Sequence, residues 1–187
     1  MSRSIGALEF RSISKGIYVS DAIIKKANVE IIYYKTICPG KFLVIVTGDE
    51  GEVDEAITYG ETINDSSIVD SFRLHAVTPA IVDAFKSKYA KQDRIDAIGL
   101  IETFKVCTGI QALDLVLKAG DVRLLKIFLA FAIGGKLVFI VTGAVSSIEY
   151  SFSACKHVLS DTEKQNMAII PSPDRAILDN LFKNAAR

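Results

Sequence analysis

The stretch Lys41–Gly48 reads KFLVIVTG, and nearly the same residues return 95 positions later as KLVFIVTG at Lys136–Gly143. Each copy is a run of β-branched and aromatic residues between a lysine and a threonine–glycine pair, a pattern typical of a buried strand. Two such strands at a fixed spacing indicate an internal repeat, which decides how the rest of the chain is organised.

The repeat extends over most of the sequence. IGALEF at Ile5–Phe10 returns 93 residues later as IGLIET at Ile98–Thr103. Further landmarks recur at that same spacing: Gly16–Ile17 as Gly109–Ile110, Asp21 as Asp114, and Val29 as Val122. The second copy has two extra residues, and they fall in one loop, TICPGK in the first half and LAFAIGGK in the second. The chain is therefore a tandem duplication whose halves differ most at this loop.

Each half is expected to contain a strand, a helix, two strands separated by the variable loop, and a second helix. The first helix is predicted from about Ser14 to Ala27, with Ile17, Ile24 and Ala27 at helical spacing. LHAVTP and AIIPSP are each predicted to form a short strand that ends at proline. We predict an α/β fold of the α+β, ferredoxin-like kind, with one domain over residues 1–90 and a second over 91–187.

In the second half, Ser146 and Glu149 have the spacing of a capping box at the start of the second helix. The apolar stripe predicted for that helix is Ile148, Phe152, Cys155 and Leu159. Residues Lys86–Asp93, KSKYAKQD, are predicted to be a charged linker between the halves.

Composition narrows the classes of function. Lysine plus arginine and aspartate plus glutamate both number 22, so the net charge is zero and a general nucleic-acid binder is not expected. The residues MSRSIGALEF lack the long apolar stretch and cleavage site of a secretory signal, so none is expected, and three widely spaced cysteines fit a reducing compartment. The apolar segment Lys126–Val145 is interrupted by Gly134, Gly135 and Lys136, so it predicts two strands and a turn rather than a membrane span.

The chemistry-bearing residues do not predict an enzyme. No phosphate-binding loop, dinucleotide fingerprint or zinc-protease motif is present, and His75 has no nucleophile placed beside it by the sequence. The recurring carboxylates are expected to cap or bridge structural units: Glu9, Glu102, Asp21 and Asp114. Cys107 and Cys155 are expected to be packing residues, whereas Cys38 is open to three interpretations: buried filler, a nucleophile or a metal ligand.

The repeated unit resembles the bacterial microcompartment shell domain. The residues that carry the resemblance are G-x-x-E from Gly6, D-A-x-x-K-x-A-x-V from Asp21, a glycine-containing loop and a strand ending in threonine–glycine. Two such domains resemble the tandem, trimer-forming shell proteins. That resemblance implies a pseudohexameric homotrimer, a flat tile with an axial pore, in the shell of a polyhedral organelle in the bacterial cytoplasm.

Within that family, the CPG loop resembles the iron–sulfur-bearing shell proteins of propanediol-utilisation compartments. The resemblance implies one [4Fe–4S] cluster per trimer, held by three copies of Cys38, for electron transfer or cluster transport across the shell. It implies pore loops made of Thr36, Ile37, Cys38, Pro39, Gly40, Lys41, Phe131, Ala132, Ile133, Gly134, Gly135 and Lys136. It also implies tile edges at Lys25 and Lys118, where other shell proteins meet the tile, and encapsulated redox enzymes as further partners.

Two alternatives follow from the same residues. A shell trimer without a cofactor would use its pore to conduct metabolites. A small-molecule sensor or enzyme, from a different class, would form a discrete oligomer that does not assemble into sheets. Family members often carry arginine in the proline-rich stretch near the domain end, where this chain has Ser172, so edge contacts through that position are not expected.

Overall fold

The computed structural model describes residues 3–63, 65–91, 94–129, 134–159 and 166–183. Its first half contains β1 (Ser4–Phe10), α1 (Ile13–Lys26), β2 (Glu30–Ile37), β3 (Lys41–Gly48), α2 (Glu50–Ile63), a 3-10 turn (Asp65–Ser67), β4 (Ile68–Leu74) and α3 (Pro79–Phe85). Its second half contains β5 (Ala97–Thr103), α4 (Val106–Ala119), β6 (Val122–Leu129), β7 (Leu137–Gly143), α5 (Val145–Cys155), β8 (Asn166–Pro171) and α6 (Arg175–Lys183).

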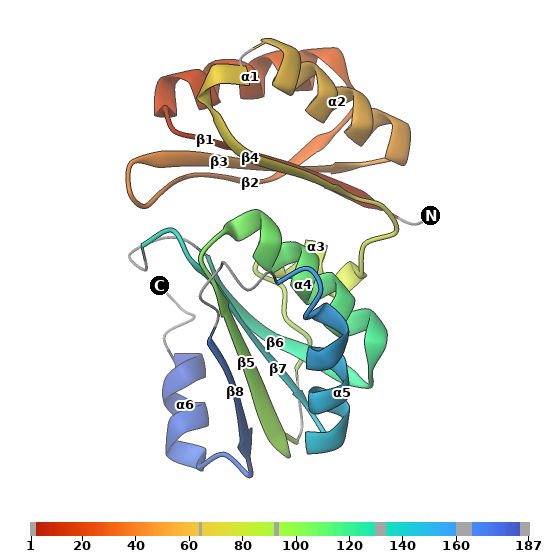
Figure 1. Cartoon of the computed structure of the whole chain (residues 1–187), viewed down its shortest axis with the longest axis vertical. Coiled ribbons are helices and arrows are strands. Elements are labelled where there is room, and N and C mark those ends of the chain that lie inside the picture. Colours follow the sequence, from red (N-terminus) through yellow and green to blue (C-terminus); the bar gives the residue numbers. More distant parts are fainter. Residues whose placement is uncertain (1–2, 64, 92–93, 130–133, 160–165, 184–187) are drawn as a thin grey trace.

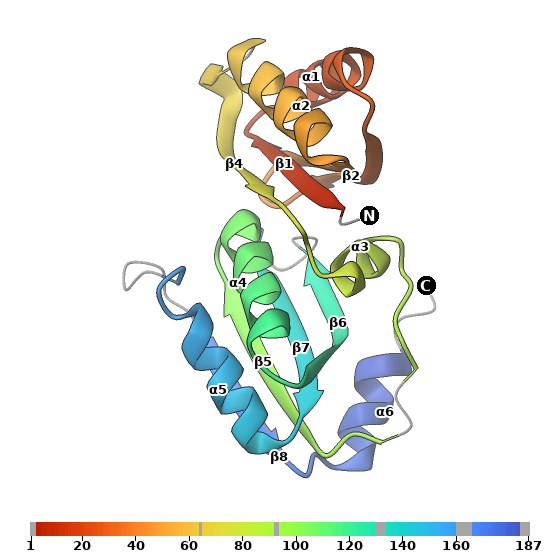
Figure 2. The same cartoon turned by 90° about the vertical axis from the view of Figure 1, so that its right-hand side faces the viewer.

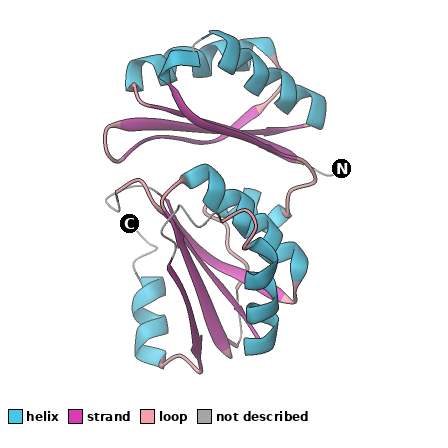
Figure 3. Cartoon of the chain, in the orientation of Figure 1, coloured by secondary structure: helices cyan, strands magenta, loops and turns pink. Residues whose placement is uncertain are grey.

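The two halves have the same topology. The strand order is β2-β3-β1-β4 in the first sheet and β6-β7-β5-β8 in the second, and the described strands pair antiparallel. Helices α1 and α2 cover one face of the first sheet, and α4 and α5 cover the matching face of the second (Figures 1 and 3). The predicted α/β fold with two copies of one unit is therefore confirmed.

The long apolar runs follow from burial on both faces of the sheet. The other face of the first sheet packs on α3 and α4 (Figures 1 and 2), so β3 lies between two apolar layers. A strand covered on both sides reads as a continuous apolar run, whereas a half-exposed strand alternates. Residues 42–47 are accordingly all buried.

The recurring glycines mark close approaches of a helix to a strand. A Cβ on Gly16 would lie 2.6 Å from the Phe42 ring, and a Cβ on Gly109 would lie 2.8 Å from Leu137. Contacts shorter than 3 Å are not tolerated in a packed interior. The repeated glycine therefore lets the first helix of each half lie directly on its third strand.

The joint between the halves is a continuous apolar core that includes a buried polar contact. Buried residues of both halves form a single cluster that includes Ile5 and Ile45 of the first sheet and Val106 and Ile110 of α4. Asp114 of α4 is buried within this joint, where Oδ1 accepts 2.9 Å hydrogen bonds from both the backbone N–H and the hydroxyl of Thr78. The expectation that Asp114 bridges structural units is confirmed.

Helix α1 buries a different face from the one that its spacing suggested. Gly16, Val19, Ser20 and Ile23 pack inward, whereas Ile17 is 47 % exposed and Ile24 is 37 % exposed. Ile110, the counterpart of Ile17, is 0 % exposed because α4 lies against the first sheet. The apolar side of α1 is therefore uncovered in the single chain, while the same side of α4 is covered.

Two local predictions were wrong, and one helix was not predicted. The strand of the first half that precedes Pro79 is Ile68–Leu74, not LHAVTP. Asp70 and Arg73 interrupt its apolar pattern, and Arg73 forms a 2.5 Å ion pair with Glu61 of α2. Residues 79–85 form α3, which the sequence did not indicate, and the predicted linker begins directly after it at Lys86. Helix α5 begins at Val145, which places Ser146 inside the first turn, and its N-cap makes no side-chain hydrogen bond, so there is no capping box.

The other expectations for this region hold. The stripe of Ile148, Phe152, Cys155 and Leu159 is buried, as predicted. The described part of segment 126–145 lies in β6 and β7 and the residues around them. Among the helices that the structure describes, none combines the length and hydropathy needed to cross a bilayer.

The joint predicts the effect of removing its buried carboxylate. Asp114→Ala would leave the Thr78 donors without their acceptor in an apolar interface, at a cost of about 2–4 kcal/mol of unfolding free energy. Urea unfolding should show this loss as a lower midpoint. Glu149→Ala is the control, because Glu149 is an exposed acid on α5 of the same half. Equal midpoints for the two variants would contradict the role of Asp114.

Candidate functional site in the paired loops

Cys38 lies at the tip of the loop that joins β2 to β3. The strands pair up to Ile37 and Lys41, so only Cys38, Pro39 and Gly40 form the turn. Gly40 has a φ of 73°, a left-handed conformation that favours glycine, and nothing lies within 4 Å of where its Cβ would be. The Cys38 side chain is half-exposed at this open tip.

The loop of the second half lies beside the first one. Gly134 and Gly135 also have left-handed φ values, 68° and 80°. A Cβ on Gly135 would lie 2.5 Å from the carbonyl oxygen of Cys38, so the backbones of the two loops meet within one chain. The structure therefore brings together two segments that are 97 residues apart in the sequence. The predicted pore residues Phe131, Ala132 and Ile133 lie outside the described residues.

Cys38 is the accessible thiol of the chain. Cys107 and Cys155 are buried, and burial raises the pKa of the Cys107 thiol well above its ordinary value and that of the Cys155 thiol to about 11. Because the thiolate is the form that binds metals and reacts, these two cysteines stay inert near neutral pH. Their expected packing role is confirmed, and of the three interpretations of Cys38 the structure removes buried filler.

The lysines that follow the two loops are paired with carboxylates of the first strand in each half. Lys41 Nζ lies 2.7 Å from Glu9 Oε1, and the Glu9 side chain is only 4 % exposed. Lys136 forms the equivalent ion pair with Glu102, and its Nζ lies 4.9 Å above the Phe104 ring. Glu9 and Glu102 thus neutralise the loop lysines within their own halves.

Lys25 and Lys118 lie at the opposite end of each half from the loops. Strand β1 runs from Ser4 toward the loop end, where Phe10 pairs with Phe42, and α1 returns along the sheet, so its last turn with Lys25 is remote from Cys38. Each lysine forms a 2.5 Å ion pair with the aspartate four residues earlier, Asp21 or Asp114. The structure does not bring these lysines into the site.

One cluster was missed by the sequence reasoning. Within the described residues, Glu50, Asp54 and His75 place ligand-type atoms within 4.8 Å of one another. His75 Nε2 lies 3.5 Å from Asp54 Oδ1, and Arg73 Nε lies 3.9 Å from the same oxygen. Arg73 and the surrounding carboxylates account for this group as part of a polar surface network, and no sequence motif indicates it.

Comparison with known proteins places this geometry in a family. The model of the BMC domain matches twice, over residues 4–80 and 97–173. The chain therefore belongs to the BMC-domain family of bacterial microcompartment shell proteins and carries two domains in tandem. Proteins of this family are structural and not catalytic, which confirms that the chain is not an enzyme.

Relatives of known name agree with this assignment. The chain is 37 % identical to the bacterial microcompartment shell protein PduT of Citrobacter freundii, over 95 % of this chain and 96 % of that protein. It is 37 % identical to the shell protein PduA of the same organism over 30 % of this chain and 61 % of PduA. The carboxysome shell protein CcmK2 of Synechocystis is 33 % identical over 32 % of this chain and 58 % of CcmK2.

Solved structures confirm the fold. A microcompartments protein from Desulfitobacterium hafniense DCB superposes with a TM-score of 0.87 at 35 % identity, covering 95 % of this chain and 99 % of that one. A fused, permuted hexameric shell protein of the RMM microcompartment superposes with a TM-score of 0.62 at 14 % identity, over 84 % of this chain and 83 % of that one. The second likeness concerns the fold alone.

The contact between the loops predicts different effects for neighbouring glycines. Alanine at either Gly134 or Gly135 adds the cost of a left-handed backbone, about 1 kcal/mol. Only Gly135→Ala also drives a methyl group into the Cys38 carbonyl, so it should displace the Cys38 turn.

Iodoacetamide labelling of cofactor-free protein measures this displacement. Gly135→Ala should change the alkylation rate of Cys38 several-fold, whereas Gly134→Ala should leave it within twofold of the wild-type rate. Equal changes in the two variants would show that the loops do not meet as described.

Proposed function

We propose that this chain forms a homotrimeric shell tile whose central pore holds a [4Fe–4S] cluster on three Cys38 thiolates, for electron transfer or cluster transport across the shell. The observation that carries the proposal is the accessible Cys38 thiol at an open turn, directly beside the loop of the second half. The likeness to PduT over nearly the full length of both proteins supports it.

The joint inside the chain supports the trimer. Helix α4 buries Ile110 against the first sheet, while α1 leaves the equivalent Ile17 exposed. Likewise α3 buries Ile81 completely, while its counterpart in α6, Ile177, is 52 % exposed. If α1 and α6 join a second copy as α4 and α3 join the first half, every such joint becomes alike. Repeating the joint around an axis closes a ring of six domains from three chains.

This assembly predicts a charge-sensitive surface on α1. Ile17→Asp places a charge where a second copy should pack, so it should convert the trimer into single chains. Light scattering after size exclusion should give three times the 20.4 kDa chain mass for the wild type and one chain mass for the variant.

Tyr150→Asp is the control, because Tyr150 is 64 % exposed on α5, away from the proposed joint. This variant should remain a trimer. A trimer that survives Ile17→Asp would disprove the proposed interface.

Three-fold symmetry gives Cys38 the coordination number that one chain lacks. A trimer presents three thiolates at equal distance from the axis. A cubane [4Fe–4S] cluster has three-fold axes through opposite iron and sulfur corners, so three irons would take Cys38 and the fourth would face solvent. Thiolate is the soft ligand that such clusters require. The half-exposed side chain and open turn of Cys38 fit this ligand set.

The loop compositions are consistent with a crowded axis. Gly40 and Gly134 both have open space where a side chain would begin. The chain contributes one accessible thiol, so the second loop would line the cluster with backbone and not with a further ligand. The lysines that follow the loops, Lys41 and Lys136, are each paired with a carboxylate of their own half.

Iron and acid-labile sulfide measured on anaerobically purified trimer test the cluster. The wild type should contain about four irons per trimer, with the EPR signal of a reduced cluster. Cys38→Ser should lose both iron and sulfide and remain trimeric. Cys107→Ala, which removes a buried thiol, should retain the iron content of the wild type.

An iron-free wild type after reconstitution would reject the cluster. The tile would then be a cofactor-free pore for metabolites, lined by the same turns. That result would leave the trimer unaffected, because the joint does not use Cys38.

The remaining assignments complete the proposal. We place the domain bounds at residues 1–90 and 91–187, and tile edges, where other shell proteins would meet the trimer, at Lys25 and Lys118. The direction of α1 puts Lys25 at the end of the domain away from the loops, as an outer edge requires. Encapsulated redox enzymes of a propanediol-utilisation compartment would be the electron or cluster partners.

A further inference from the structure

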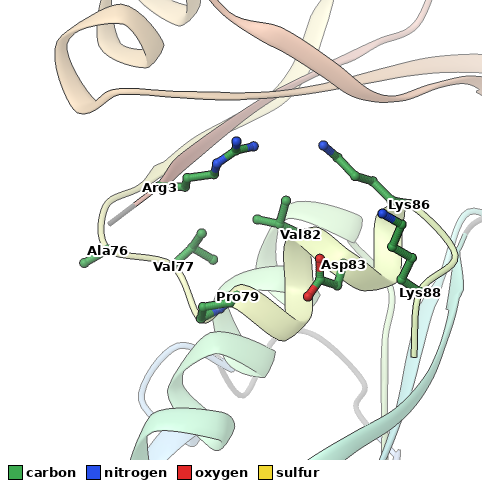
Figure 4. A pocket seen from close by; sticks show the side chains of 8 residues that line it. All are labelled: Arg3, Ala76, Val77, Pro79, Val82, Asp83, Lys86 and Lys88. Carbon is green, nitrogen blue, oxygen red and sulfur yellow. The ribbon is translucent and has the colours of Figure 1, made fainter. Parts of the chain in front are cut away.

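A cavity of about 580 Å³ opens within the first half, between Arg3 at the start of β1 and the residues of α3 and its flanking loops, at the end of the first sheet that is remote from Cys38. Val77, Pro79 and Val82 supply its apolar lining. Its charged lining comes from Arg3, Lys86, Lys88 and one acidic residue, Asp83. In Figure 4 the side chains of Arg3 and Lys86 point toward each other across the mouth of the cavity.

A carboxylate of the chain itself lies between these two cations. Glu30, the first residue of β2, accepts a 2.7 Å hydrogen bond from Lys86 Nζ and a 3.5 Å hydrogen bond from Arg3 Nη1. The hydrogen bond from Lys86 lowers the pKa of the Glu30 carboxyl, so it stays ionised at neutral pH. The Glu30 side chain is 55 % exposed and therefore has room to swing outward.

We propose that this cavity binds a small aliphatic carboxylate, whose head takes the place of Glu30 between Arg3 and Lys86. Its aliphatic body would lie on Val77, Pro79 and Val82. Two cations that already hold one carboxylate have the spacing to hold another. The volume lies within the range of ligand sites, which are mostly apolar clefts with a few convergent polar groups.

The site belongs to the first half alone. In the second half, Asp96 occupies the position equivalent to Arg3, and Phe182 occupies the position equivalent to Lys86. The repeated joint between copies would therefore lack both cations, so the expected stoichiometry is one ligand per chain. The cavity lies at the opposite end of the first sheet from Cys38, so ligand binding there does not depend on the proposed cluster.

Calorimetric titration of the full-length assembled protein with acetate and hexanoate tests the apolar wall. Each buried methylene contributes a factor of about four in affinity, so hexanoate should bind at least tenfold more tightly than acetate. A hexanoate affinity no greater than that of acetate would overturn the proposal.

Variants of the three charged residues test the head-group contact, because they should change hexanoate affinity in opposite directions. Arg3→Gln and Lys86→Gln should each weaken hexanoate binding at least fivefold, whereas Glu30→Gln should strengthen it, because it removes the internal competitor. Lys156→Gln, an exposed lysine outside the cavity, should match the wild type. The proposal would be overturned if Glu30→Gln bound hexanoate no more tightly than the wild type. It would also be overturned if Lys156→Gln lost as much affinity as Lys86→Gln.

Discussion

The structure depends on the burial of α4 against the first sheet. Helices α1 and α2 cover one face of that sheet, and α4 packs on the other face (Figures 1 and 2). This contact merges the two halves into one apolar core, and Asp114 fixes it by accepting two hydrogen bonds from Thr78. The buried Asp114 carboxylate therefore has hydrogen-bond partners on the other half, as a polar group in an apolar interface requires. The same packing brings Gly135 to the carbonyl of Cys38.

Duplication with divergence makes the two halves structurally different. The joint is built once inside the chain, while α1 and α6 keep apolar residues exposed where the proposed second copy would pack. The two loops also differ: the first carries the accessible thiol, and the described part of the second contributes glycine backbone. A proposed trimer would thus alternate ligands and spacers around its axis, giving three thiolates and not six.

Much of the fold was predictable, because repeats and strand composition are local signals. The third strands and the buried stripe of α5 follow from their own residues. The buried face of α1 was not predictable: helical spacing groups Ile17 with Ile24 but does not say whether a neighbour covers them. The loop contact and the Lys41–Glu9 pair join residues distant in sequence, so only the folded chain shows them. The sequence singled out Cys38 as a candidate ligand, and the structure places its partly exposed side chain at an open turn; its ligand role stays a prediction.

The proposed function requires three Cys38 loops to meet on one axis around a metal cluster. Anomalous diffraction at the iron absorption edge, from crystals grown without oxygen, tests it most directly. The account predicts iron density centred on a three-fold axis, with the sulfur atoms of three Cys38 residues at bonding distance and no fourth protein ligand. Iron density away from that axis, or an axis that carries Cys38 thiols and no iron after reconstitution, would contradict it.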